Sequence, residues 1–99
     1  METTSTMLAI HSTGDGPWVP VMHLRKIRVQ GAISDDVIQI EFKDHVLGYD
    51  PEPLTIRGSR VKTLNYPRGK VRVNRVGGKT PITVLAICER SPNAIKADE

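Results

Sequence analysis

Apolar and polar residues alternate with a period of two along several short stretches of this chain. In "KIRVQGA", Ile27 and Val29 point to one side and Arg28 and Gln30 to the other, and "DDVIQIEF" alternates in the same way. Such alternation is typical of β-strands that have one buried face and one wet face. No window repeats its apolar residues at the helical spacing i, i+3, i+4, i+7. The pattern therefore predicts an all-β protein.

Glycine and proline residues divide the alternating stretches into seven predicted strands. These are Ser5–His11, Met22–Gln30, Val37–Phe42, Pro53–Ile56, Val61–Leu64, Lys70–Val76 and Ile82–Glu89. Short strands at this spacing are typical of a β-sandwich or a small barrel. A chain of 99 residues, of which 38% are hydrophobic, suits one compact soluble domain. We therefore expect a single-domain antiparallel β-sandwich over residues 1–99.

The last predicted strand is apolar on both faces. One face carries Ile82, Val84, Ala86 and Cys88, and the other carries Leu85 and Ile87. Either this strand is central and covered on both sides, or its second face meets a partner. Before it, Gly77-Gly78 supplies the positive φ of a tight turn, which predicts a hairpin with the preceding strand. The proline-rich segment "DPEP" is predicted to be a surface loop.

Charge is distributed unevenly along the chain, although its net value is only +3. Eight basic residues and no acidic ones lie between Arg57 and Lys79, whereas Asp35 to Glu52 holds six acids against Lys43 alone. Such an arrangement fits two solvated faces, and it also fits binding of the basic side to a polyanion or to an acidic protein neighbour. If copies of the chain meet side by side, the two blocks could pair.

The basic block carries few aromatic residues, and this affects the choice of partner. Proteins that bind single-stranded nucleic acid combine basic side chains with aromatic platforms, whereas only Tyr66 lies within this block. We therefore predict that Arg68, Arg72 and Arg75 contact protein and bind DNA only non-specifically. A nucleic-acid-binding β-barrel that uses residues 57–79 is the alternative reading.

No constellation of residues predicts catalysis, a cofactor or a metal. His11, His23 and His45 are far apart and lack the spacing of metal ligands, so each should be replaceable without loss of function. Asp35-Asp36 is interpreted as a turn before a strand. Cys88 cannot form an internal disulfide and fits a buried, inert thiol in a reducing compartment. We expect no enzyme. No targeting signal and no membrane helix are predicted, because the apolar runs are too short.

Three stretches carry a resemblance to a known group of proteins. "WVPV", a strand ending in "VQG", and "YPRGKVRVNRVGGKTPITVLAI" together resemble the pattern of small β-sandwich proteins of tailed bacteriophage particles. The resemblance spans roughly residues 18–87. It implies a virion component, assembled in the host cytoplasm, that binds other capsid or tail subunits as a decoration, cement, head-fibre or tail accessory protein.

The sequence also suggests how such a protein would assemble. Trp18 follows a Gly-Pro turn and either caps one end of the core or anchors an interface. The polar ends, about residues 1–10 and 91–99, cannot bury enough apolar surface to order themselves. We therefore expect them to act as arms that lie on neighbouring subunits, within a homo-oligomer or on a capsid lattice. A carbohydrate-binding sandwich is a second alternative, which the scarcity of aromatic rings disfavours.

Overall fold

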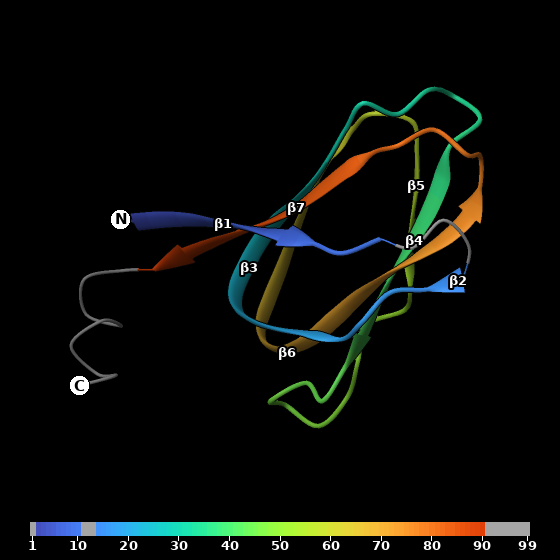
Figure 1. Ribbon diagram of the computed structural model, residues 1–99. Coiled ribbons are helices and arrows are strands. Elements are labelled where there is room, and N and C mark those ends of the chain that lie inside the picture. Colours follow the sequence, from blue (N-terminus) through green and yellow to red (C-terminus); the bar gives the residue numbers. More distant parts are fainter. Residues whose placement is uncertain (1, 11–13, 91–99) are drawn as a thin grey trace.

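The computed structural model describes residues 2–10 and 14–90, which form seven β-strands and no helix. The strands are β1 (Glu2–Leu8), β2 (Gly14–Asp15), β3 (Val19–Gln30), β4 (Val37–Lys43), β5 (Leu54–Arg57), β6 (Val61–Gly77) and β7 (Thr83–Arg90). All pairings are antiparallel, in the order β1-β7-β3-β6-β4-β5, and β2 adds to β6 (Figure 1). The predicted all-β class is confirmed.

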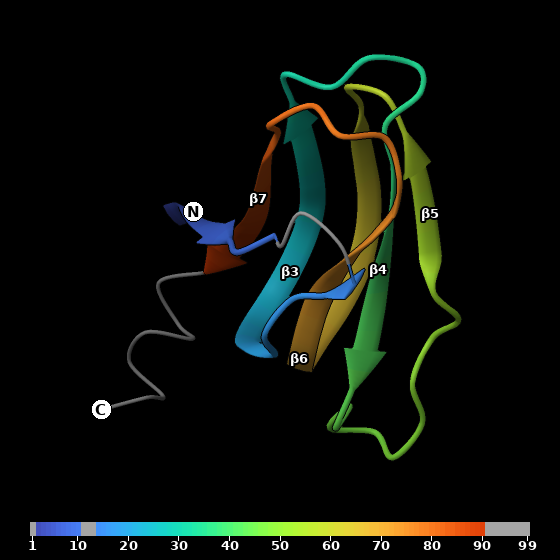
Figure 2. The same ribbon diagram turned by 45° about the vertical axis from the view of Figure 1, so that its right-hand side comes forward.

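Two long strands hold the sheet together. The first part of β3 pairs with the later part of β6, and its second part pairs with both β7 and the beginning of β6. The register shifts between Leu24 and Lys26, and both strands curve through this region (Figures 1 and 2). A shift of this kind bends a strand and increases its twist. The strands are connected as one curved antiparallel sheet, and the finer prediction of a two-sheet sandwich stays a prediction.

The curved sheet has two parts, which we call the first and the second half-sheet. The first half-sheet contains β1, β7, the second part of β3 and the beginning of β6. The second half-sheet contains β5, β4, β2, the later part of β6 and the first part of β3. Buried side chains from both form one hydrophobic core, for example Val29 and Val84 from the first and Ile38, Ile40 and Val73 from the second. Alternation along each strand leaves the polar residues outside.

Two sequence predictions about strand pairing were wrong. Val61–Leu64 and Lys70–Val76 belong to one continuous strand, β6, which runs through Pro67 and Gly69. Gly77-Gly78 does not close a hairpin, since β7 pairs with β1 and β3 and has no ladder with β6. The chain instead crosses from one half-sheet to the other. β7 therefore lies inside the sheet, with β1 at one edge and β3 at the other.

The beginning of the chain is part of the fold. Glu2–Leu8 forms β1 and pairs with β7 over its whole length, and Leu8 is buried in the core. The prediction that residues 1–10 form an arm is therefore wrong for this strand, whose threonine-rich sequence favours an extended backbone. The second predicted arm, residues 91–99, lies outside the described residues.

Candidate protein-binding surface

The outer face of the second half-sheet carries three of the residues predicted to bind a partner, namely Trp18, Arg68 and Arg72. Val71 and Val73 face the core, so Arg72 points outward, and register places Arg68 opposite Met22. The guanidinium of Arg72 lies 3.1 Å from Glu41 and 3.4 Å from Asp15.

The ring of Trp18 lies on this face and contacts two cationic side chains. Arg72 and Lys43 each lie 4.5 Å from the centre of its ring. Cation–aromatic contacts and shared carboxylates fix these side chains relative to one another. The half-buried Trp18 is therefore held on the outer surface at the start of β3 and does not enter the main core cluster.

Arg75 has a different position from the other predicted arginines. Its side chain is only 6% exposed and lies 3.2 Å from Asp36, and it donates to the Thr80 carbonyl at 2.7 Å. Asp36 also accepts from the backbone N–H groups of Ile33 and Thr80. The hydrogen bond from Ile33 holds the pKa of Asp36 below its usual range, with support from Thr80 and from the charge of Arg75. Arg75 thus fastens the crossover after β6 to the turn before β4.

Leu85 and Ile87 lie on the outer face of the first half-sheet, away from Trp18. β7 is covered at both edges, by β1 and β3, and Ile87 is buried. Leu85 is half-buried, opposite Met7 in β1, whose side chain is 69% exposed. β7 is therefore central in the sheet, and the predicted partner residues fall on two separate faces.

The loop between β4 and β5 presents an apolar surface that the sequence reasoning missed. Val46, Leu47 and Tyr49 are 55%, 61% and 70% exposed. They lie within "DHVLGYD", where Gly48 has a φ of 87° and Asp44 a φ of 57°. The available sequence signal for their exposure was the presence of apolar residues between two aspartates and beside a glycine, because apolar side chains in a surface turn do not pack into the core.

Backbone hydrogen bonds fix the shape of this loop. The N–H of Val46 donates to the Arg68 carbonyl at 3.0 Å, which ties the loop to the bend of β6. The N–H of Leu47 donates to Nδ1 of His45 at 2.9 Å, and the N–H of His45 donates to Asp50 at 3.1 Å. These hydrogen bonds hold the backbone of the loop in one arrangement.

Tyr66 is a buried residue that connects the loop to the core. The residue is 1% exposed, and its hydroxyl donates to the Lys43 carbonyl at 3.0 Å and to Asp50 at 3.3 Å. Its ring packs against Phe42 and, edge-on, against His45, with ring centres 4.9 and 4.8 Å apart. Burial, together with the charge of Asp50, raises the pKa of Tyr66 to about 12.

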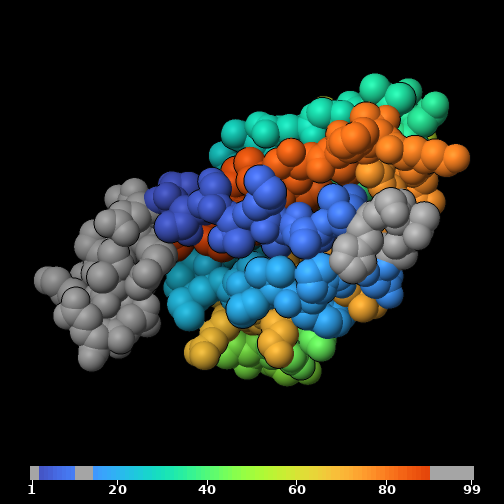
Figure 3. Space-filling view, in the orientation of Figure 1, coloured from blue at the N-terminus to red at the C-terminus, as the bar shows by residue number. Residues whose placement is uncertain are grey.

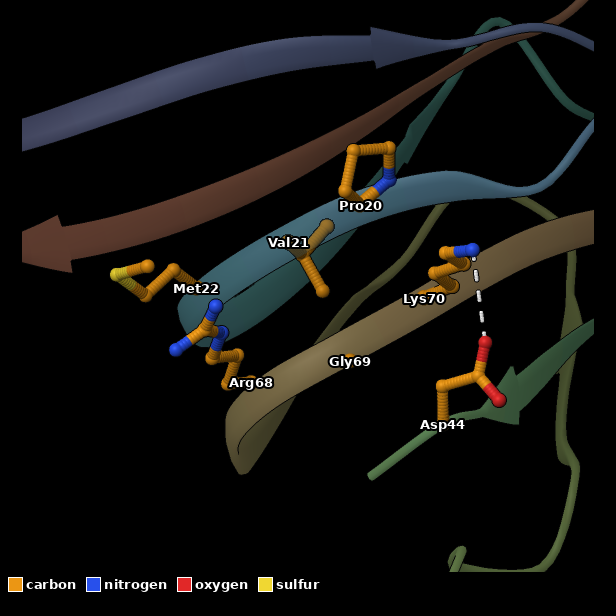
Figure 4. Close-up of a pocket in the computed structure, with 7 residues that line it drawn as sticks. All are labelled: Pro20, Val21, Met22, Asp44, Arg68, Gly69 and Lys70. Atoms are coloured by element: carbon orange, nitrogen blue, oxygen red, sulfur yellow. Dashed lines mark ion pairs between the residues drawn. The ribbon is translucent and has the colours of Figure 1, made fainter. Parts of the chain in front are cut away.

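A hollow of about 440 Å³ lies beside the loop. Its lining is Pro20, Val21, Met22, Asp44, Arg68, Gly69 and Lys70. Figure 4 shows Met22 and Arg68 next to each other at one end and the Lys70–Asp44 ion pair, 3.5 Å long, at the other. The loop, the β6 bend and the start of β3 lie together at the lower end of the molecule (Figure 3). We call Met22, Val46, Leu47, Tyr49 and Arg68 the loop-tip surface.

The described residues show no group of three or more His, Cys, Asp or Glu side chains placed to hold a metal ion. His45 lies in the loop, stacked on Tyr49, and His23 lies in β3 with a φ of 56°, whereas His11 is outside the described residues. Cys88 is buried, and burial raises the pKa of its thiol. Across residues 2–10 and 14–90, no helix is long and apolar enough to cross a membrane.

Comparison with known proteins yields no relatives: no family model, curated protein or solved structure matches this chain.

Proposed function

We propose that this chain is a non-enzymatic structural protein that binds other protein subunits through the loop-tip surface. The exposed apolar side chains of Val46, Leu47 and Tyr49, on a loop whose backbone is held by hydrogen bonds, carry the proposal. A contiguous apolar patch on a small polar domain is typical of a binding site. Tyrosine and arginine are also the residues in which binding energy concentrates at interfaces, and Arg68 borders the patch.

The rigidity of the loop supports protein binding on energetic grounds. Ordering a mobile side chain at an interface costs about 0.5–1.5 kcal/mol, and ordering loop backbone adds to that cost. Hydrogen bonds to Arg68, His45 and Asp50 set the backbone before any partner arrives. A surface of this kind can bind with less loss of entropy than a flexible loop of equal composition.

Three of the eight cations of the basic block are already paired within the chain, which reduces the charge left for a phosphate backbone. Lys70, Arg72 and Arg75 each form an ion pair with a carboxylate of the same chain. A phosphate backbone needs cations whose neighbours do not already neutralise them. Together with the resemblance found in the sequence, this leads us to propose that the partners are capsid or tail subunits of a phage-like particle and further copies of the chain.

Sedimentation tests the proposal. Lysate from the organism that produces the chain is separated on a sucrose gradient, with and without DNase. The experiment compares the wild type with a double variant, Val46→Asp/Leu47→Asp, which we call the loop variant, and with a control variant, Val76→Asp. Val76 is 62% exposed and lies at the end of β6, so it controls for a new surface charge. We expect the wild type and Val76→Asp to sediment with large particles in a DNase-resistant manner. The loop variant should lose at least about 30-fold in affinity, which corresponds to a hot spot of 2 kcal/mol.

The outcomes separate the readings. Wild-type protein that remains at the top of every gradient, or a loop variant that still sediments with particles, would contradict the proposal. Release of the wild type by DNase would favour the nucleic-acid alternative. Light scattering of the purified wild type and variants measures self-association. The loop variant should self-associate less than the wild type.

A further inference from the structure

Strand β1 is an edge strand whose outer side is open. Among the described residues it pairs with β7 alone, and it stands at the opposite end of the strand order from β5 (Figure 2). Its ladder with β7 runs without the register shift seen in β3. The residues from Thr3 to Met7 are all exposed, including Thr4 and Thr6, which share a face with the buried Leu8. A regular strand edge is therefore open at one end of the sheet.

The backbone pattern across the sheet shows which groups of β1 point outward. The N–H of Val29 donates to the Arg60 carbonyl at 2.8 Å, so Val29 directs its backbone groups away from β7. In an antiparallel strand, the N–H and C=O of one residue point to one neighbour and those of the next residue point to the other. Val84, which stands opposite Val29, therefore directs its groups toward Leu8 in β1. Counting back from Leu8, every second residue points outward, namely Met7, Ser5 and Thr3.

β1 lacks the features that protect a strand edge from pairing. Folded proteins block such edges with lysine, proline, a bulge or a very short strand. The other end of the sheet follows this rule, because β5 has four residues and comes directly after Pro53. Residues 3–7 of β1, "TTSTM", carry no charge and no proline, and threonine favours the extended backbone. The β1 edge is thus suited to pairing with a further strand.

We propose that the β1 edge pairs with the β1 edge of a second copy of the chain, antiparallel and about a two-fold axis at Ser5. The outward residues are spaced evenly around Ser5. This register therefore sets Thr3 of each copy opposite Met7 of the other, and Ser5 opposite Ser5. Each of these pairs exchanges two backbone hydrogen bonds, so every outward group of residues 3–7 finds a partner. The two chains then share one continuous sheet.

The composition of the edge selects a second copy as its occupant. A two-fold contact requires a surface that is complementary to itself. Residues 3–7 meet this requirement because no like charges face one another. Thr4 of each copy also stands opposite Thr6 of the other, and threonine pairs across strands contribute to pairing. Met7, which is 69% exposed, is partly covered by the added strand. The proposal does not depend on the loop-tip surface.

Sedimentation equilibrium of the purified full chain tests the inference. The wild type should form dimers. Ser5→Lys sets two like charges against each other at the axis and should weaken dimerisation at least tenfold. Thr55→Lys adds the same charge at an exposed position of β5, the opposite edge strand, and it should dimerise as the wild type does. The loop variant leaves β1 unchanged, so it should keep the dimer and lose only association beyond it.

Cysteine crosslinking tests the register. In the proposed dimer the Cα atoms of the two Ser5 residues lie about 5.5 Å apart, within the range of a disulfide. The two Thr3 residues are four positions out of register, which places them about 14 Å apart. Under mild oxidation, Ser5→Cys should form a disulfide-linked dimer. Thr3→Cys, on the same face and also exposed, should not, and the wild type with its buried Cys88 gives the background.

Hydrogen exchange on the wild type needs no variant and reports strand pairing directly. The amides of Ser5 and Met7 should become protected as the protein concentration rises, whereas those of Thr4 and Thr6, which face β7, should be protected throughout. A monomeric wild type, a monomeric loop variant, or dimerisation of Ser5→Lys at wild-type strength would overturn the proposal. Equal crosslinking of Ser5→Cys and Thr3→Cys would do the same. Protection of Ser5 only after particle subunits are added would assign the edge to a foreign strand and also overturn it.

Discussion

Replacing Tyr66 by phenylalanine removes one hydroxyl from the anchor of the β4–β5 loop and leaves the ring in place. The hydroxyl donates to the Lys43 carbonyl at 3.0 Å and to Asp50 at 3.3 Å. A buried hydrogen bond contributes about 0.5–1.5 kcal/mol to stability, and a bond to a charged group contributes more. The Asp50 contact is longer and its residue is exposed, so water replaces part of what is lost.

Because the hydroxyl has one proton for these two acceptors, Tyr66→Phe should cost about as much as one buried hydrogen bond at the upper end of this range, about 1.5 kcal/mol. In a domain of this size, that corresponds to a fall of about 6–12 °C in melting temperature. Urea unfolding measures the free energy directly. Tyr49→Phe is the matched control, because its side chain is 70% exposed and it should change stability by less than about 0.5 kcal/mol.

Hydrogen exchange reports whether the loss is local. The amides of Val46 and Leu47 donate to Arg68 and His45, and we expect their protection to fall in Tyr66→Phe by more than that of the core strands. A variant as stable as the wild type, with unchanged protection of these amides, would refute the role of Tyr66 as the anchor of the loop.

The same residue makes stability depend on alkaline pH. The pKa of Tyr66 is raised to about 12 in the folded chain, above the value of about 10 for an unfolded tyrosine. Folding therefore favours the neutral form, and this contribution is complete below pH 10 and is lost as the pH rises from about 10 to 12. Tyr66→Phe should lack this part of the alkaline loss in urea titrations.

Further variants test the crossover after β6. The pKa of Asp36 is lowered in the folded chain, so its contribution to stability is present above about pH 4, the unfolded value, and is lost as the pH falls through the lower folded value. Asp36→Asn should therefore flatten the acid limb of a stability–pH curve, and an unchanged acid limb would contradict this. Gly78 and Gly48 have φ values of 84° and 87°, but a Cβ at Gly78 would overlap Asp36, whereas one at Gly48 meets nothing. Thermal unfolding should show Gly48→Ala losing about 1 kcal/mol and Gly78→Ala at least twice as much, and equal losses would exclude the clash.

Local alternation predicted which residues face the core. Ile27, Val29, Ile38 and Ile40 alternate with polar residues in the sequence and are buried in the structure. The turn at Asp35-Asp36 and the burial of Cys88 also followed from the residues next to them. These predictions succeed because the period of a strand depends only on its own backbone.

The loop-tip surface had no comparable signature. Its shape depends on hydrogen bonds from Tyr66 to Asp50, 16 residues apart, and from Val46 to the carbonyl of Arg68. Irregular loops have no period, so the exposure of these apolar residues was indicated only by the two aspartates and the glycine beside them. The arginines were equally ambiguous: Arg68 is exposed, whereas Arg75 is buried against Asp36, and both belong to the same basic block.

The sequence by itself determined the all-β class and the inward and outward faces of the strands, because hydrophobic periodicity is local. Only the tertiary structure decided which strands pair. Gly77-Gly78 has the composition of a hairpin turn, yet β7 pairs with β1 and β3 and has no ladder with β6. The partners of β7, and the ion pair between Asp36 and Arg75 that spans 39 residues, arise from burial across the whole sheet, which no short window of sequence contains.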